Sequence, residues 1–378
     1  MKSIGIITYH NYNNYGTMLQ AFALQHAIAN MGYEAEIIDF KQNNSLSRVE
    51  MIKLRLKRLP VYIKEREKYA ALRSAESDFD ARKKKFEAFY NRNLVISKNH
   101  YTSTQQLVDN PPEYDAYIVG SDQTWNPYVA NAPEAFYLPF VEDDKQKGSY
   151  GPSLAVADLT EEQRALYKKR LKDFAFLSCR EQAGADLLTQ VIGRKVEQVL
   201  DPTLLLDASE WEGYSADFKV DDPYILEYFL GEKKYHRDYV EKLSKMTGFR
   251  VISLPVTYLE IVNKGIDKVW GGPAEFLSLI KNASVVCTDS FHGTMFSINF
   301  NTNFYAFCKT EDTESSSENS RLYSALEMFH LRDRLVKVGD QPETSTLEID
   351  FSEANRLLTM ERDKSMAYLR NMLGTMTK

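Results

Sequence analysis

The chain has 378 residues, of which 43% are hydrophobic and 26% are charged, and its formal net charge is −6. This length exceeds what one hydrophobic core usually organises, so we expect two domains. No charge-free apolar run approaches the roughly 18 residues of a membrane-spanning helix. The opening, MKSIGIITYH, is too short and too polar after Ile7 for a signal peptide, so a cytoplasmic protein is expected.

Cysteine and charge patterns narrow the class further. The three cysteines are odd in number and widely spaced, which favours reduced thiols, and no Cys or His pair has metal-ligand spacing; neither a metal nor a cofactor is expected. From Arg48 to Lys85, thirteen Lys and Arg stand against six Asp and Glu, a local charge of +7 in an otherwise acidic chain. Because the whole chain is acidic, nucleic acid is not an expected partner.

The first half of the chain predicts a doubly wound sheet. Its opening combines a strand from Ser3 to Thr8, the polar turn HNYNNYGT, a helix over 18–31 and a strand over 34–40, which is a βαβ unit. Residues 45–100 predict a basic, helical insertion without a strand pattern. Later strand patterns alternate with helical stretches and lie at 114–119, 174–178 and 196–199.

A second alternation begins after Asp201-Pro202-Thr203. It consists of strands at 224–229, 250–253 and 284–288, with helices at 238–246, 273–281 and 293–300. The end, 352–373, predicts one long helix. The fold class that we expect is α/β: two Rossmann-like domains, 1–207 and 208–350, with a C-terminal helix over 351–378 that packs back on the first domain.

A polar knot follows the strand at 284–288. In an open parallel sheet, ligands bind beyond the carboxyl ends of strands, where helices begin. The residues that reach this position are Asp289, Ser290, Phe291, His292, Gly293 and Thr294. A glycine allows close approach of a ligand, and the first N–H groups of the next helix favour an anion. His292 could then donate a hydrogen bond to a phosphate or carboxylate, or transfer a proton. The alternative is that Ser290 only caps the helix and that His292 is an interior residue whose hydrogen bonds are made within the protein.

A second strand end carries the residues of a sugar site. A carboxylate, an amide and an indole follow the strand at 114–119 within five residues: Ser121, Asp122, Gln123 and Trp125. Sugar hydroxyls need donors and acceptors, and an aromatic face packs on pyranose C–H groups. Asp122 is a candidate general base for a hydroxyl. In the alternative interpretation Ser121 and Asp122 cap a helix and Trp125 is a core residue.

Two arginines are candidate anion clamps. Arg180 follows the strand at 174–178 and can hold a phosphate or carboxylate bidentately, or else form a structural ion pair with Glu181 or a distant acid. Arg321 follows the polar stretch 310–320, which suits either a lid that delivers a cation or a solvated loop. The first turn, with Asn14, Tyr15 and Gly16, lacks the known phosphate-binding glycine patterns, so nucleotide binding has no motif to support it.

Taken together, the chain resembles the polysaccharide pyruvyl transferase family. The matching stretches span most of the chain: the NNYG turn, YIVGSDQTWN, SYGPSLA, SCREQAG, VLDPTLLL, GGPAEFL, TDSFHGT and NSRL. The resemblance implies a GT-B-type arrangement of the two domains. It also implies transfer of a pyruvyl group from phosphoenolpyruvate to two hydroxyls of one sugar, with release of phosphate.

The resemblance assigns Arg180 and His292 to the donor. Family members often have an arginine two residues before the histidine, where this chain has Ser290, and Arg321 is the candidate substitute. Some members have an acid after the glycine of the first turn, where this chain has Thr17, so the role of that turn stays open. We therefore expect His292 and Asp122 to be catalytic. The expected donor residues are Arg180, Ser290, His292, Gly293, Thr294 and Arg321; the expected acceptor residues are Asn14, Tyr15, Gly16, Ser121, Gln123 and Trp125.

The implied acceptor is a saccharide, with galactose bridged through its 4- and 6-hydroxyls as a guess by analogy. A polyprenyl-diphosphate-linked acceptor would give the basic segment 48–85 a purpose, as a peripheral contact with the inner face of the plasma membrane. The alternative for that segment is a solvated helical hairpin. Two rival functions stay open: a nucleotide-sugar-dependent GT-B glycosyltransferase, and a noncatalytic saccharide-binding protein, which would not need Arg180 and His292 facing one cleft.

Overall fold

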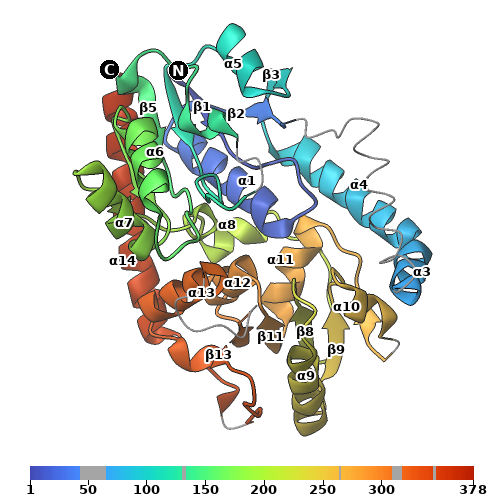
Figure 1. Cartoon of the computed structure of the whole chain (residues 1–378). Helices are drawn as coiled ribbons and strands as arrows, with labels where there is room; N and C mark the ends of the chain where they lie inside the picture. The colour runs from blue at the N-terminus through green and yellow to red at the C-terminus, as the bar shows by residue number, and fades with distance from the viewer. Residues whose placement is uncertain (43–64, 130–132, 264, 309–316, 344–345) are drawn as a thin grey trace.

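The computed structural model describes residues 1–42, 65–129, 133–263, 265–308, 317–343 and 346–378. Within them, two parallel sheets with flanking helices form two halves of the molecule, and a long C-terminal helix lies beside the first (Figure 1). The predicted α/β class with two Rossmann-like domains is confirmed. The domain limits of 207 and 350 stay a prediction.

The first sheet has the strand order β3-β2-β1-β4-β5, and all its pairs are parallel. Its strands are β1 (Ser3–Ile7), β2 (Glu34–Phe40), β3 (Ile96–Tyr101), β4 (Ala116–Val119) and β5 (Lys147–Ser149). The strand β3 corrects the predicted helical insertion, which was expected to continue to residue 100. Because β3 is an edge strand with the half-exposed sequence ISKNHY, its sequence carries no apolar strand pattern.

Helices and a short strand pair surround this sheet. The pair β6 (Ser178–Cys179) and β7 (Glu197–Gln198) is parallel and adjoins β5 through a bridge between Gly148 and Phe176. The helices of this half are α1 (Tyr15–Asn30), α5 (Thr104–Asp109), α6 (Glu161–Leu171), α7 (Gln182–Ile192) and α8 (Ala208–Glu212). Single 3₁₀ turns lie at Glu134–Tyr137, Asp144–Gln146 and, as η3, Pro202–Leu204.

The second sheet has the order β10-β9-β8-β11-β12-β13 and is also parallel in all its pairs. Its strands are β8 (Tyr224–Tyr228), β9 (Arg250–Ser253), β10 (Asp267–Lys268), β11 (Val285–Thr288), β12 (Phe304–Phe307) and β13 (Leu335–Val336). The helices are α9 (Lys234–Thr247), α10 (Tyr258–Val262), α11 (Pro273–Asn282), α12 (Phe291–Asn299) and α13 (Ser317–Met328), with a 3₁₀ turn at Arg332–Arg334.

The C-terminal helix α14 (Ser352–Met376) returns to the first half, as predicted, and runs beside β5 in Figure 1. The Tyr368 hydroxyl donates to the backbone oxygen of Ser149 at 3.0 Å, and the Ser365 hydroxyl accepts from the Leu200 N–H at 2.9 Å. The sulfur atoms of Met372 and Met376 lie against Gly148, where a side chain would collide with them. These contacts attach the C-terminal helix to the β5 edge of the first sheet.

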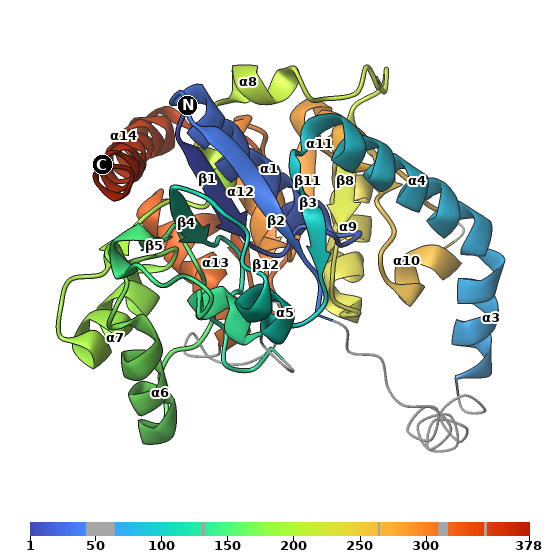
Figure 2. The ribbon, with the colours of Figure 1, turned by 90° about the horizontal axis from the view of Figure 1, so that it is seen from above.

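The described part of the insertion is a helical arm, α3 (Arg66–Ser74) and α4 (Glu76–Asn93), that lies along the second half of the molecule (Figure 2). Its basic side chains pair there: Lys68 with Glu232 at 3.0 Å, and Lys85 with Glu275 at 2.7 Å. Of the segment 48–85, for which a membrane contact is expected, residues 48–64 lie outside the described residues. Among the described residues, no helix combines the length and the apolar character needed to cross a bilayer.

Candidate functional site

One carboxylate, that of Asp201, contacts two of the predicted donor residues. Asp201 follows β7 and caps η3, with its Oδ1 accepting from the N–H and the hydroxyl of Thr203. Its Oδ2 lies 2.7 Å from Nη1 of Arg180 and 3.4 Å from Nε2 of His292. Arg180 comes from the first half of the molecule and His292 from the second. Asp201 therefore links the two halves at the carboxyl ends of their strands.

Arg180 forms structural ion pairs and also has one N–H group that makes no hydrogen bond to a described residue. Its side chain is buried, its Nε lies 3.3 Å from Glu181 Oε1, and its guanidinium lies 4.5 Å from the centre of the Phe291 ring. Burial lowers the pKa of Arg180, but Asp201 and Glu181 outweigh this effect and raise it. Its Nη2 has no hydrogen-bond partner among the described residues. That buried donor is what an anionic ligand requires.

Asp201 keeps its negative charge in this buried place. Burial alone would raise the pKa of Asp201, whereas His292 and Arg180 together hold it well below its usual range. The contact with His292 is at ion-pair distance but lacks the alignment of a hydrogen bond, since His292 Nε2 has no hydrogen-bond partner among the described residues. The imidazole is thus held beside a negative charge, and its Nε2 makes no hydrogen bond to a described residue.

His292 is placed by two glycines. A Cβ on Gly16 would lie 2.0 Å from His292 Nδ1, so the start of α1 approaches the imidazole as closely as only glycine allows. Gly293 packs on Thr288 at the end of β11, where a Cβ would lie 2.7 Å from the threonine hydroxyl. The Ser290 side chain caps α12 by accepting from the Gly293 N–H at 3.3 Å. Ser290 therefore caps the helix, as in the alternative interpretation, and His292 lies at the interface between the two halves.

Asp122 lies at the neighbouring strand end of the first sheet, in a backbone conformation with φ of 63°. Its Oδ2 accepts from the Thr17 hydroxyl at 2.8 Å, and its backbone oxygen accepts from the Ser153 N–H at 2.8 Å. The negative charge of Asp122 contributes to the raised pKa of Arg180. Thr17 thus has the role that the sequence left open for the first turn: it orients the candidate base.

Three predicted acceptor residues are core residues instead. Trp125 is fully buried and donates from its indole N–H to the Phe136 oxygen at 3.1 Å. Tyr15 is buried between the two halves, and its hydroxyl donates to the Gly271 oxygen at 2.7 Å. The buried Ser121 hydroxyl donates to a backbone oxygen in the segment that follows β5. The polar atom of each side chain thus already bonds a backbone oxygen, and the assignment of these residues to the acceptor stays a prediction.

The remaining predicted residues have local roles. The Gln123 side chain accepts from the Asn126 amide at 2.6 Å, and Asn14 caps α1 by accepting from the Thr17 N–H at 3.0 Å. The buried Thr294 hydroxyl donates to the Ser290 oxygen at 3.1 Å. These hydrogen bonds are local to the turns in which the three residues lie. Asp122, the predicted base for the acceptor, is different because its carboxylate contacts Thr17 of the first turn.

A small cavity joins the predicted donor cations. Arg321 reaches it from α13 and lines it together with Arg180, Asp201 and Phe291. Its apolar wall is formed by Leu200, Leu204, Met295, Ala325, Met328 and Phe329. The predicted loop 310–320 is corrected at its end, because residues from 317 onward belong to α13; residues 310–316 of the predicted lid lie outside the described residues.

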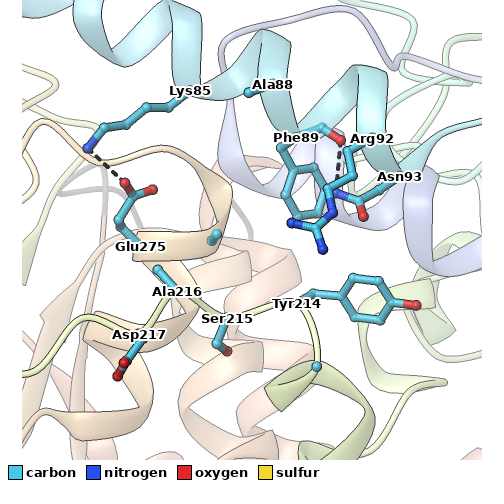
Figure 3. Close-up of a pocket in the computed structure, with 12 residues that line it drawn as sticks. Lys85, Ala88, Phe89, Arg92, Asn93, Tyr214, Ser215, Ala216, Asp217 and Glu275 are labelled. Atoms are coloured by element: carbon cyan, nitrogen blue, oxygen red, sulfur yellow. Dashed lines mark hydrogen bonds and ion pairs between the residues drawn. The ribbon is translucent and has the colours of Figure 1, made fainter.

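A larger groove of about 460 Å³ lies between α4, α11 and the segment after α8 (Figure 3). Figure 3 shows the Lys85–Glu275 pair on one side of it and Arg92 with Tyr214 on the other. It contains none of the residues predicted for donor or acceptor. Its size alone does not make it the active site, since the cations and the histidine converge elsewhere.

The sequence analysis missed the roles of Asp201 and Phe291, whereas the ion pair of Arg180 with Glu181 was one of its alternatives. Glu181 is buried, bonds the Ser153 hydroxyl and pairs with Arg180. A signal for Asp201 existed: an acid before proline, after a strand and within the apolar run VLDPTLLL, is a buried carboxylate that needs partners. Which cations supply them depends on tertiary structure.

A model of the polysaccharide pyruvyl transferase family matches residues 14–307 of the chain. Among solved structures, UGT89C1 of Arabidopsis thaliana complexed with UDP-L-rhamnose is similar, with a TM-score of 0.52 and 11% identity over 100% of this chain and 99% of that chain. UDP-GlcNAc 2-epimerase from Neisseria meningitidis bound to UDP-GlcNAc has a TM-score of 0.49 and 10% identity, over 99% of each chain. The first likeness confirms the GT-B-type arrangement. No curated protein sequence matched the chain.

Proposed function

The chain belongs to the polysaccharide pyruvyl transferase family, and from that premise we propose that it transfers the pyruvyl group of phosphoenolpyruvate to two hydroxyls of one sugar. The product is a cyclic ketal, and inorganic phosphate is released. The observation that supports this proposal is the convergence of Arg180 and His292 on Asp201, beside a cavity that Arg321 also lines. A noncatalytic saccharide-binding protein has no need of that convergence.

On the donor side, Arg180 and Arg321 bind the phosphate and carboxylate of phosphoenolpyruvate. Guanidinium groups suit both anions because their N–H groups match pairs of oxygens. The spare Nη2 of Arg180 is the first contact that we assign. The cavity is about 20 Å³, room for one water molecule, so the donor enters when the two halves move apart.

The chemistry needs an acid, a base and anion clamps. His292 protonates the methylene carbon of phosphoenolpyruvate, and one sugar hydroxyl forms a C–O bond to the adjacent carbon while Asp122 takes its proton. The C–O bond to phosphate then breaks, with the electron pair leaving on phosphate. The second hydroxyl forms the second C–O bond and gives its proton to His292, which restores the acid, while Asp122 passes the first proton to the released phosphate. One donor and one diol give one ketal and one phosphate, without any change of redox state.

We place the acceptor in a lipid-linked or capsular polysaccharide precursor, with galactose bridged at its 4- and 6-hydroxyls as the first sugar to test. A polyprenyl-diphosphate carrier would keep this work at the cytosolic face of a membrane, where the segment 48–85 would supply the peripheral contact. Within that segment, Lys68, Arg82 and Lys85 contact the second half of the molecule, whereas Lys83 and Lys84 are exposed.

The test is to incubate the protein with phosphoenolpyruvate and a panel of soluble and lipid-linked galactosides, and to measure phosphate release together with product mass. Acceptor-dependent phosphate release and a product heavier by one pyruvyl ketal would support the proposal. Silence across that panel, with turnover of nucleotide sugars, would favour the GT-B glycosyltransferase instead.

A further inference from the structure

The turn after β1 carries Tyr9 and Tyr12 and adjoins the turn that carries Asp122. Ile7 pairs with Val119 at the ends of β1 and β4, and the Thr8 hydroxyl donates to the Ser121 oxygen at 3.2 Å. Tyr9 and Tyr12 meet edge to face, with ring centroids 5.8 Å apart, and Tyr9 packs on Phe136 at 4.8 Å. Tyr12 is 46% exposed, whereas Trp125 is fully buried. The turn after β1 therefore offers an exposed aromatic ring, which the predicted tryptophan does not.

Tyr9 carries an unused polar atom toward the same place. Its hydroxyl is buried and has no hydrogen-bond partner among the described residues. Burial raises the pKa of Tyr9 most, and Tyr12 and the charge of Asp122 raise it further. A buried hydroxyl without a partner costs free energy, and a ligand hydroxyl removes that cost.

Polar groups continue along this edge beyond the two rings. Asp39 accepts two imidazoles, with Oδ1 3.3 Å from His10 Nε2 and Oδ2 2.9 Å from His100 Nδ1. The Lys41 ammonium lies 6.0 Å from the centre of the Tyr12 ring. An aromatic face with donors and acceptors at its border is complementary to a pyranose, which has an apolar C–H face and a rim of hydroxyls.

We propose that Tyr12 and Tyr9 form the binding platform for the acceptor sugar. The pyranose packs on the Tyr12 ring, one of its hydroxyls bonds the Tyr9 hydroxyl, and the hydroxyl pair to be bridged is thereby directed to Asp122. This assignment rests on the proposed transfer to a saccharide, and it replaces Trp125 and Tyr15 as the aromatic residues of the acceptor site.

The test compares three variants in the acceptor-dependent assay: Tyr12→Ala, Tyr9→Phe and, as control, Tyr258→Ala. Tyr258 lies on α10 in the second half, and it too has a lysine ammonium, that of Lys68, 5.9 Å from its ring centre. We expect KM for methyl β-D-galactoside to rise about tenfold in Tyr12→Ala and several-fold in Tyr9→Phe. KM for phosphoenolpyruvate should stay unchanged in both, and the control should match the wild type.

A binding measurement separates this inference from the proposed reaction. Saturation-transfer NMR with methyl β-D-galactoside reports binding by the full chain without turnover. Binding that Tyr12→Ala weakens, without any pyruvyl transfer, would support the platform and count against the reaction. Absence of galactoside binding to the wild type, equal binding by wild type and Tyr12→Ala, or an equal rise of both KM values would overturn the platform.

Discussion

Asp201 and His292 face each other across the two halves of the molecule, with 3.4 Å between Oδ2 and Nε2. Because the same oxygen holds Arg180 at 2.7 Å, one carboxylate fixes both a cation and a proton-transfer group. Arg180 and His292 come from segments far apart in the chain, and Asp201 is the residue that contacts both. The arrangement makes Asp201 a positioning residue for both.

Asp201→Asn is expected to lower kcat/KM for phosphoenolpyruvate by 10- to 100-fold, because it leaves Arg180 and His292 without their shared charge. It should also lower the free energy of unfolding by about 3 kcal/mol at pH 7. The pKa of Asp201 is held down in the folded state, so this stabilisation is present above the usual pKa of about 4 and fades as pH falls further. Steady-state kinetics with urea unfolding at pH 7 and pH 3 measures both effects. A loss of stability with unchanged kcat/KM would reduce Asp201 to a purely structural residue.

Gly16→Ala is expected to lower kcat at least tenfold while the chain still folds, because the added Cβ would occupy the place of the His292 imidazole. Gly374→Ala is the matched control, since a Cβ at that position in α14 meets nothing within 4 Å. The control should keep full activity and gain a few tenths of a kcal/mol in stability. Circular dichroism and phosphate release would check the pair; equal activity of the two variants would contradict the close approach at Gly16.

The pH dependence of stability tests a buried acid in the second sheet. Burial raises the pKa of Glu227 on β8 to about 7. The folded chain therefore keeps a proton that the unfolded chain loses near pH 4.5, and the free energy of unfolding falls by about 3 kcal/mol as pH rises from 4.5 to 7. Glu227→Gln removes this contribution. Urea unfolding of both proteins at pH 5 and pH 8 should show a smaller pH effect in the variant, and an identical pH effect would refute it.

The helical arm is expected to detach when its central contact is removed. Arg82 donates to the Pro255 oxygen at 2.7 Å, and its guanidinium lies 5.6 Å from the Trp270 ring centre. Arg82→Ala should speed amide hydrogen exchange in α3 and α4, whereas the exposed neighbour Lys83, changed to Ala, should not. Exchange measured by mass spectrometry distinguishes the two; equal protection would mean that the arm is held by other contacts.

The sequence predicted what depends on local pattern. The strands at 34–40 and 250–253 agree residue for residue with β2 and β9, because adjacent β-branched apolar residues mark the centre of each, Ile37 with Ile38 and Val251 with Ile252. Arg180 and His292 were singled out because each follows a strand, and ligands bind beyond the carboxyl ends of parallel strands; their role at the donor stays a prediction. Packing decided the rest: β3 is a half-exposed edge strand, Trp125 is covered by its neighbours, and the partners of Asp201 come from segments far along the chain.

The most direct measurement is acceptor-dependent phosphate release from phosphoenolpyruvate by the wild type and by His292→Ala, with the product mass recorded. The account predicts that the wild type releases phosphate only with a sugar acceptor and adds one pyruvyl ketal to it. His292→Ala should still fold, as circular dichroism would show, and lose at least 100-fold in kcat. Near-normal turnover by His292→Ala would contradict the assigned role of the histidine, and the absence of a ketal from the wild-type product would contradict the reaction itself.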